Sequence, residues 1–307
     1  MKISLIDDKY KEEAMDIWNY CFNIPETKMD WLWENQLKDK NCLAAFEEKV
    51  MAACLAIKPF HIYFNKKKVK MGGIGLVGTL PEYRHSNYAS KTLVRSLEIM
   101  RENEQLFSIL GPFSVAYYRK YGWEIAYQMQ EYHLTMENLK DLGSGQGKIK
   151  ALKEKDIEDL MSTYYQFASS YNGSLVRDMN YWQEKFIKDK LIQSKDLYLY
   201  GYYNDQGVLE GFIDYYLEDK IFKIREMITV SLEAKKELLN FIYKHRAQAD
   251  QIKGYFPPDD RTILILKMIK GSKNIKIPGK MGRVVDVKKV LELIPYDSNI
   301  NNNYTIK

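Results

Sequence analysis

The segment from Leu76 to Ala89 has the residue types and the order of a phosphate-binding turn. An apolar, strand-like run ends at Pro81, a short basic and polar loop follows, and a helical pattern begins near Asn87. The first N–H groups of a helix have no intrahelical partner and lie at the positive end of the helix dipole, which suits a pyrophosphate. Small residues at such a turn let the backbone approach the phosphates. The segment therefore predicts an anion site where the helix starts.

Two glycine-rich stretches imitate nucleotide-binding loops. Gly73–Gly78 reads GIGLVG and matches the dinucleotide pattern GxGxxG. That fingerprint must leave a strand and open a helix at once, whereas Thr79–Tyr83 separates these glycines from the helix. Residues 141–148 read DLGSGQGK, do not fit GxxxxGK[ST] and precede no helix directly, so they indicate a linker. For the loop after Pro81, an ordinary strand–helix junction stays the alternative.

A second cluster, YYRKYGWE at 117–124, follows the loop after about thirty residues. It holds Tyr117, Tyr118, Tyr121 and the turn-forming Gly122. These tyrosines could simply fill a core. Both interpretations can hold, because only Tyr118 needs to face a cleft.

The elements that would position these residues follow from hydrophobic periodicity and breakers. The order is β-α-α-β-β-β-α-β-α-β, which is an α+β layer with one central helix. The expected strands are 3–7, 42–47, 50–58, 60–65, 69–80, 106–111, 122–127 and 129–136, and the expected helices are 11–22, 27–37, 87–103 and 114–120.

A second set of elements follows the linker. The strand–helix pair at 221–246 echoes the earlier pair at 72–97, which suggests an internal duplication whose second copy lost its loop signature. An incidental likeness between two strand–helix units is the alternative. The pattern predicts helices at 152–167, 178–189 and 231–246, strands at 196–203, 208–217 and 221–230, and a short strand or helix start at 284–293.

Composition excludes several classes of function. The chain has 46 basic and 41 acidic residues, a net charge of +5, without the basic stripe of a nucleic-acid-binding face. Three cysteines with no CxxC and no HExxH argue against a disulfide framework and a metal site. Neither a signal-peptide core nor an apolar run of membrane-spanning length is visible. We expect a cytoplasmic protein with no membrane, nucleic-acid or metal partner.

The loop Arg84-His85-Ser86-Asn87-Tyr88-Ala89 resembles the CoA-binding loop [R/Q]-x-x-G-x-[G/A] of the GNAT N-acetyltransferases. Arg84 and Ala89 match, and Asn87 stands in place of the middle glycine. Asparagine is the next most tolerant residue for positive φ. YYRKYGWE resembles the C-terminal GNAT motif, in which the tyrosine at Tyr118 points its hydroxyl at the CoA sulfur.

The resemblance implies an acetyl-CoA-dependent N-acetyltransferase with Tyr118 as catalytic acid. A neutral amine would attack the thioester, a backbone N–H within Val77–Thr79 would stabilise the oxyanion, and Tyr118 would protonate the departing thiolate. The implied cofactor-binding residues are Val77, Gly78, Thr79, Arg84, His85, Ser86, Asn87, Tyr88, Ala89, Ser90, Phe113 and Ser114. The candidate substrate walls are Phe22, Trp33 and Trp182, and for each of them a place in the core is the favoured interpretation.

Over most of its length the chain is similar to the enhanced-intracellular-survival (Eis) branch of this superfamily. That likeness implies two GNAT-like mixed-sheet domains in tandem, at 1–140 and 149–280 with the linker 141–148 between them, the second domain being degenerate. It implies that 281–307 begins a sterol-carrier-like domain, truncated at Lys307. In the family the carboxylate that ends this domain is the general base, so another base would be required. It also implies a small-molecule or peptide amine acceptor and homo-oligomers, since family members form hexamers.

Two other functions remain open at this stage. A non-catalytic acyl-CoA sensor or scaffold is favoured by Asn87 and the truncation, and is disfavoured by Tyr118 in its motif. An aminoacyl-transferase of the peptidoglycan-bridge type also uses paired GNAT-like units. The intact loop at Arg84–Ala89 argues against it, because such enzymes need no CoA site there.

Overall fold

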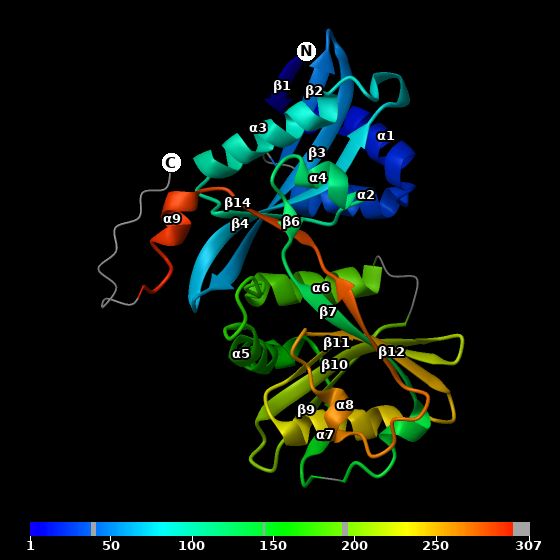
Figure 1. Cartoon of the computed structure of the whole chain (residues 1–307). Coiled ribbons are helices and arrows are strands. Elements are labelled where there is room, and N and C mark those ends of the chain that lie inside the picture. Colours follow the sequence, from blue (N-terminus) through cyan, green and yellow to red (C-terminus); the bar gives the residue numbers. More distant parts are fainter. Residues whose placement is uncertain (38–40, 144, 192–195, 297–307) are drawn as a thin grey trace. The chain divides into compact units, whose positions relative to one another are not determined.

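The computed structural model describes residues 1–37, 41–143, 145–191 and 196–296 (Figure 1). Contacts divide the chain into two compact units. The first is Met1–Trp123 together with the segment from Gly282 onward, and the second is Glu124–Met281. The chain forms two seven-stranded sheets.

The first sheet is antiparallel over its first four strands and then turns parallel between β4 and β5. β3 pairs with β4 over a long hairpin that turns at Asn65 and Lys66, both at positive φ. The strands stand in the order β1 (Lys2–Leu5), β2 (Cys42–Glu47), β3 (Val50–Phe64), β4 (Lys67–Thr79), β5 (Phe107–Leu110), β14 (Met281–Val284) and β6 (Glu124–Ile125).

Helices cover both faces of this sheet because successive residues of β2 and β3 point to opposite sides. Ala44 and Cys54 pack with the buried Trp18 of α1, whereas Ala45 and Ala53 pack with Tyr88 of α3. The helices are α1 (Lys11–Phe22), α2 (Glu26–Leu32) continued by a π-helical turn (Trp33–Leu37), α3 (Tyr88–Glu102), α4 (Val115–Arg119) and α9 (Val287–Leu291).

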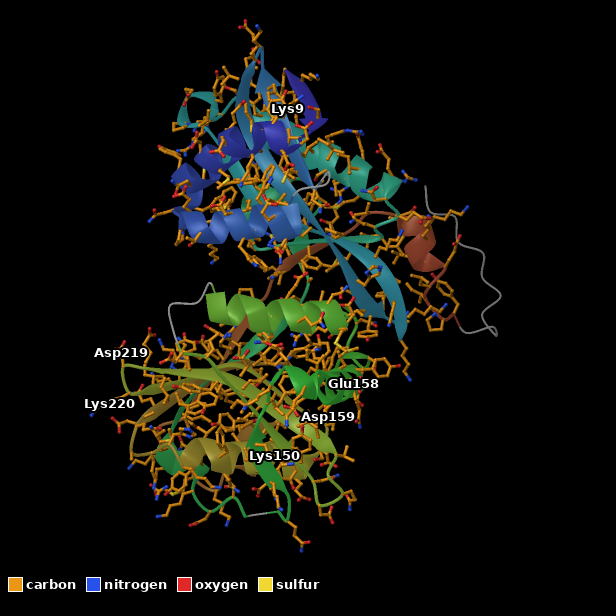
Figure 2. All side chains as sticks on the ribbon, turned by 180° about the vertical axis from the view of Figure 1, so that it is seen from behind. Lys9, Lys150, Glu158, Asp159, Asp219 and Lys220 are labelled. Carbon is orange, nitrogen blue, oxygen red and sulfur yellow. The ribbon has the colours of Figure 1, made fainter. Side chains whose placement is uncertain are left out.

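The second sheet repeats this plan, with β11 and β12 as its parallel pair. Its β10–β11 hairpin turns at Asp219 and Lys220, both at positive φ (Figure 2). The strands stand in the order β13 (Lys273–Pro278), β7 (Gln128–Thr135), β12 (Gln251–Phe256), β11 (Ile221–Thr229), β10 (Leu209–Glu218), β9 (Tyr198–Tyr203) and β8 (Lys148–Ala151). The helices are α5 (Ile157–Ala168), α6 (Met179–Leu191), α7 (Leu232–Tyr243) and α8 (Thr262–Ile265).

A series of side-chain contacts covers the outer edge of this second sheet. The Lys150 ammonium of β8 lies 4.6 Å from the centre of the Tyr203 ring, and the Tyr203 hydroxyl donates to Asp159 of α5 over 3.0 Å. Figure 2 shows Lys150 and Asp159 in this part of the unit. The contacts tie the edge strand to the helix that follows it.

The predicted class, two α+β units with mixed sheets in tandem, is confirmed. Strands β8, β12, β13 and β14 were not predicted. β3 runs unbroken where 50–58 and 60–65 were expected as separate strands, since Pro59 lies beyond the end of β2 and its missing N–H costs no ladder bond there.

The boundary between the two compact units does not fall at the linker predicted at 141–148. β7 pairs with β12 and β13 in the second sheet, so the units part at Trp123. Residues 282–296 belong by their contacts to the first unit. That 281–307 begins a sterol-carrier-like domain stays a prediction, and 297–307 lie outside the described residues. Within the described part of the chain, no helix has the length and apolarity to cross a membrane.

Candidate active site

Strands β4 and β5 diverge and leave an opening in the first sheet. They pair only from Met71–Ile74 to Phe107–Leu110, so residues 75–79 of β4 have no strand partner on that side among the described residues. The glycines that flank this opening border free space, since a Cβ atom on Gly75 or Gly111 would meet no atom within 4 Å. A chain-like ligand could therefore lie along the unpaired edge of β4.

A β-bulge bends β4 where it leaves β5. Cys54 lies opposite Gly78 and Ala56 opposite Gly75, so Leu76 and Val77 together face one residue of β3. Leu76 takes φ 53°, and its carbonyl accepts the Trp18 indole N–H over 2.6 Å. Because a bulge leaves one residue outside the ladder, backbone groups here are free to face a ligand.

Helix α1 approaches the strand closely at Gly78, just after the bulge. A Cβ atom at this position would lie 2.7 Å from Cγ2 of Ile17 and 3.4 Å from Cδ1 of Trp18. Gly78 is buried, whereas Val77 and Thr79 are half-buried. The predicted cofactor role of Gly78 thus has a packing role beside it.

The loop after Pro81 begins with a short 3-10 turn and ends at a helix with open amides. His85 takes φ 65° and Asn87 φ 64°, both left-handed. Asn87 gives α3 no side-chain cap, and the N–H groups of residues 88–90 find no acceptor within the described chain. Residues 84–87 are exposed, and the Arg84 guanidinium lies 5.7 Å from the centre of the Tyr20 ring. The loop has the geometry that an anion site requires.

Side chains at the start of α3 have other partners. The Tyr88 hydroxyl donates to Glu47 over 2.5 Å, and its ring packs edge-on against Tyr83. Ser90 donates to the carbonyl of Asn87 over 2.9 Å. In Tyr88, the half-buried Ala89 and Ser90, the backbone N–H is therefore the group that remains available to a ligand.

Tyr118 lies buried in a group of aromatic rings. Its side chain is 2% exposed, with the rings of Phe113 at 5.3 Å, Tyr117 at 5.2 Å and Trp123 at 6.4 Å. Burial, and to a lesser extent Tyr117, raises the pKa of Tyr118 to about 12. No described residue forms a hydrogen bond with the Tyr118 hydroxyl. The phenol is therefore neutral at physiological pH and free to donate.

The predicted pair Phe113 and Ser114 precedes this tyrosine. Phe113 is 74% exposed, so a large apolar ring stands in solvent beside Tyr118. Ser114 caps α4, since its Oγ accepts the N–H of Tyr117 over 3.3 Å. The cap aligns the short helix that carries Tyr118.

The turn after Tyr118 is held by a residue that sequence reasoning missed. Gly122 takes φ 82°, and a Cβ atom there would lie 2.9 Å from Nη1 of Arg283. The Arg283 guanidinium lies 5.4 Å from the centre of the Trp123 ring, whose indole N–H donates to Ser108 over 3.2 Å. Only the presence of β14 in this sheet reveals the contact.

The three candidate substrate aromatics lie in different surroundings. Phe22 is 44% exposed at the end of α1. Trp33 is buried in the first unit and donates to Asp8 over 2.8 Å. Trp182 is buried in the second unit against Tyr164 and Phe212. Their part in substrate binding stays a prediction.

The second unit has the same strand geometry but a different loop. β11 and β12 pair only from Ile221–Ile224 to Gln251–Gly254, and a bulge at Arg225 interrupts the β10–β11 ladder. Ser231 caps α7, because its Oγ accepts the N–H of Ala234 over 3.0 Å. The amides that stay open at the start of α3 are thus partly satisfied here.

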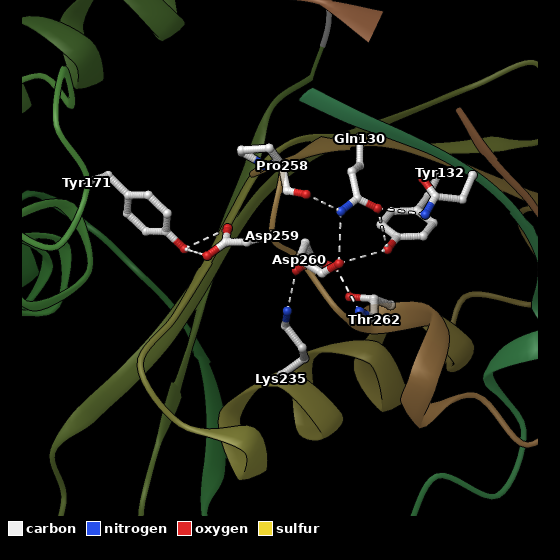
Figure 3. A network of polar contacts seen from close by, with 9 residues as sticks. Gln130, Tyr132, Tyr171, Lys235, Pro258, Asp259, Asp260 and Thr262 are labelled. Atoms are coloured by element: carbon white, nitrogen blue, oxygen red, sulfur yellow. Dashed lines mark hydrogen bonds and ion pairs between the residues drawn. The ribbon is translucent and has the colours of Figure 1, made fainter. Parts of the chain in front are cut away.

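Acidic side chains stand after β12 at this point of the second unit. A cavity of about 410 Å³ is lined by Thr229, Lys235, Asp259 and Asp260, among others. The Tyr171 hydroxyl donates to Asp259 over 3.0 Å, and Lys235 forms an ion pair with Asp260 (Figure 3). Arg261 also lines this cavity, so two basic side chains stand beside its two carboxylates. That the second copy is degenerate stays a prediction.

Comparison with known proteins agrees with this geometry. Two family models described as acetyltransferase (GNAT) domains match residues 2–126 and 173–284. The chain therefore belongs to the GNAT acetyltransferases and carries two such domains in tandem. No curated protein sequence matches this chain.

Solved structures share the tandem fold. A probable N-acyltransferase from Enterococcus faecalis has 23% identity and a TM-score of 0.85, covering 97% of this chain and 76% of its own. A GCN5-related N-acetyltransferase from Anabaena variabilis has 23% identity and a TM-score of 0.84, with the same coverage. Eis1 from Mycobacterium abscessus has 17% identity, a TM-score of 0.78 and coverage of 97% and 77%.

Proposed function

We propose that the first unit transfers an acetyl group from acetyl-CoA to a primary amine, by direct attack while both substrates are bound. The observation that carries this proposal is the uncapped start of α3, which the loop 80–87 joins to a bulged strand that has parted from its neighbour. This arrangement offers backbone amides to the diphosphate of CoA. It also offers an unpaired strand edge to the part of CoA that joins the diphosphate to the sulfur.

Four features of the chain support binding of CoA at this place. Residues 88–90 offer backbone N–H groups, and the α3 dipole adds positive potential. Arg84 stands exposed at the loop and adds a formal charge. The positive φ of His85 and Asn87 lets the loop turn back on itself before the helix begins. The same proposal includes CoA contacts made by Val77, Thr79, Ser86 and Phe113.

Tyr118 supplies the proton in the proposed reaction. The amine nitrogen forms a bond to the acetyl carbon, the carbon–sulfur bond breaks, and the thiolate takes the phenolic proton of Tyr118. The amine gives up a proton to solvent or to a base. A backbone N–H at the bulge, within Val77–Thr79, stabilises the negative oxygen that develops during attack.

The proposal is tested by two measurements on the whole chain. Calorimetry measures acetyl-CoA binding, and thiol release measures turnover with spermidine, kanamycin and an N-terminally blocked lysine as acceptors. Binding together with thiol release in the presence of at least one amine is the expected result. Binding without release for any amine indicates the acyl-CoA sensor, and absence of binding contradicts both functions. A cytoplasmic location and assembly into homo-oligomers stay predictions.

A further inference from the structure

The cavity of about 410 Å³ in the second unit is lined by the end of α5, the end of β11 and the loop that follows β12. Its lining includes Phe167 and Tyr171 at the end of α5, Val230 after β11, and Asp259 and Arg261 in the loop. All of the lining residues belong to the second unit. The cavity is therefore a separate place from the proposed acetyl-transfer site, which the first unit forms.

A buried side chain fixes the loop after β12. Gln130 of β7 is 6% exposed, and its Nε2 donates to the carbonyl of Pro258 over 2.7 Å and to that of Asp260 over 3.0 Å (Figure 3). The Asp260 carboxylate accepts the N–H of Thr262 over 2.8 Å. The residues directly before and after Asp260 both line the cavity. The backbone that carries these two charged side chains is therefore held in place.

Two of the four charged side chains in this lining are not ion-paired. Lys235 pairs with Asp260. Asp259 receives a phenol only, because the Tyr171 hydroxyl donates to its two oxygens over 3.0 and 3.1 Å and no described residue forms an ion pair with it. The Arg261 guanidinium forms neither an ion pair nor a hydrogen bond within the described part of the chain. One negative and one positive charge, both exposed, thus remain open to a ligand.

These two open charges favour a ligand that carries both signs. An amine alone would leave the Arg261 guanidinium unpaired, and a carboxylate alone would share the cavity with the Asp259 carboxylate, which repels it. A carboxylate offers about four acceptor sites, so Asp259 can bind an ammonium group while it keeps the Tyr171 phenol. A guanidinium binds a carboxylate through two parallel hydrogen bonds. A zwitterion therefore matches the charges of the lining.

The apolar part of the lining indicates what else the ligand carries. The rings of Phe167 and Tyr171 lie with their centres 5.0 Å apart, and Met227, Val230 and Pro257 also line the cavity. An aromatic face attracts an ammonium group, and apolar surface is favourably covered by an apolar side chain. The lining therefore suits a zwitterion with an apolar substituent.

We infer that this cavity binds a free α-amino acid with an apolar side chain. The ammonium group pairs with Asp259, the carboxylate pairs with Arg261, and the side chain contacts Phe167 and Val230. The two charged residues are two positions apart, about 7 Å in an extended chain, so the long Arg261 side chain can reach a carboxylate that lies one carbon from the ammonium group. This site is additional to the proposed acetyl transfer and does not depend on it.

The test compares three compounds of one carbon skeleton on the whole protein without acetyl-CoA. L-Leucine carries both charges, isopentylamine only the ammonium group and 4-methylpentanoate only the carboxylate. L-Phenylalanine, phenethylamine and 3-phenylpropanoate form a second series. We expect NMR titration with at least one of the two amino acids to shift the amides of residues 166–171 and 259–262, and its two analogues to bind there about tenfold more weakly.

Two results overturn the inference. The first is that neither amino acid shifts these amides at about 50 mM, including the case in which the shifts are confined to the first unit. The second is that, in both series, an analogue with only one of the charges binds at these residues as tightly as the amino acid.

Variants assign the two ends of the ligand. D259N and R261M should each weaken binding of the amino acid about tenfold, and R261M should not weaken binding of the matching amine. D205N and R246M, at exposed charged residues of the second unit outside the lining, are the controls and should change neither. R261M breaks no described side-chain contact, so it keeps the inference testable if D259N does not fold. Unchanged binding of the amino acid in R261M contradicts the inference, whatever the result for acetyl-CoA.

Discussion

Trp18 and Leu76 are joined by a hydrogen bond of 2.6 Å between the indole N–H and a backbone carbonyl. Leu76 is the left-handed residue of the β4 bulge, and Trp18 is fully buried on α1. The bond satisfies a carbonyl that the bulge removes from the β3–β4 ladder. It thereby connects the packing of α1 to the backbone that is proposed to face the acetyl group.

Replacing Trp18 by phenylalanine tests this connection. W18F keeps an aromatic ring but leaves the Leu76 carbonyl without its donor, so the free energy of unfolding should fall by about 1–3 kcal/mol and turnover should fall as well. T163V removes a comparable buried bond in the second unit, from the Thr163 hydroxyl to the Leu209 carbonyl over 2.6 Å, and is the control, which should lose stability and keep turnover. Denaturant unfolding and thiol release measure the two effects. Full activity of folded W18F would show that the hydrogen bond at the bulge is not needed for catalysis.

Replacing Tyr118 by phenylalanine removes the proposed acid and little else. The ring stays packed against Phe113 and Trp123, and the hydroxyl has no described partner to lose. We expect kcat to fall by roughly 10²–10⁴ while the Kd for acetyl-CoA stays within about twofold. Y121F, in the same turn, should retain nearly full turnover. Equal activity of Y118F and the unaltered chain would exclude the role of Tyr118.

The pH dependence of turnover follows from the burial of Tyr118. Its pKa is raised to about 12, so the phenol stays protonated from neutral pH to about pH 10. Turnover should therefore rise with pH as the amine acceptor deprotonates, and should not fall below pH 10 through loss of the acid. The pH profile of kcat for the unaltered chain measures this. If kcat falls near pH 8 and Y118F abolishes this fall, the pKa of Tyr118 is lower than its burial implies.

Asn87 should be replaceable by glycine and not by a β-branched residue. Its φ of 64° costs glycine nothing, whereas valine in the left-handed region is strained by about 1–2 kcal/mol. We expect N87G to bind acetyl-CoA as tightly as the unaltered chain or more tightly. N87V should bind several-fold to tenfold more weakly by calorimetry. A large loss in N87G would mean that the asparagine side chain itself contacts the ligand.

The half-buried ion pair of Arg177 and Glu226 should stabilise the second unit. Two guanidinium nitrogens donate to the two carboxylate oxygens, each over 2.6 Å, and the guanidinium lies 4.0 Å from the centre of the Tyr164 ring. Because R177M leaves a partly exposed carboxylate without its partner, it should lower the free energy of unfolding by about 1–3 kcal/mol. R246M, at an exposed arginine beside Tyr243, is the control. If R177M loses less than about 1 kcal/mol of unfolding free energy, the ion pair does not stabilise the second unit as predicted.

Local features of both units could be read from the sequence. Helix 11–22 was predicted within its observed bounds, and helix 87–103 differs from α3 by one residue at each end. Both follow from apolar spacing on one face, which neighbouring residues determine. The left-handed Asn87 and the turn at Gly122 also follow from residue type, because few residues adopt positive φ without strain.

Several features of the site depend on residues far apart in the chain. The bulge at Leu76, the contact of Arg283 with Gly122 and the burial of Trp33 and Trp182 have no local signature. The cavity at Asp259 likewise needs α5, β11 and the loop after β12 to meet.

The sequence by itself determined the class of the fold, and it singled out the loop and the tyrosine on which the proposed function rests. The tertiary structure alone decided which strands share a sheet, since β7 pairs with β12, more than a hundred residues further along the chain. Pairing is selected by the apolar area that the whole sheet buries, and that quantity exists only once distant segments have come together.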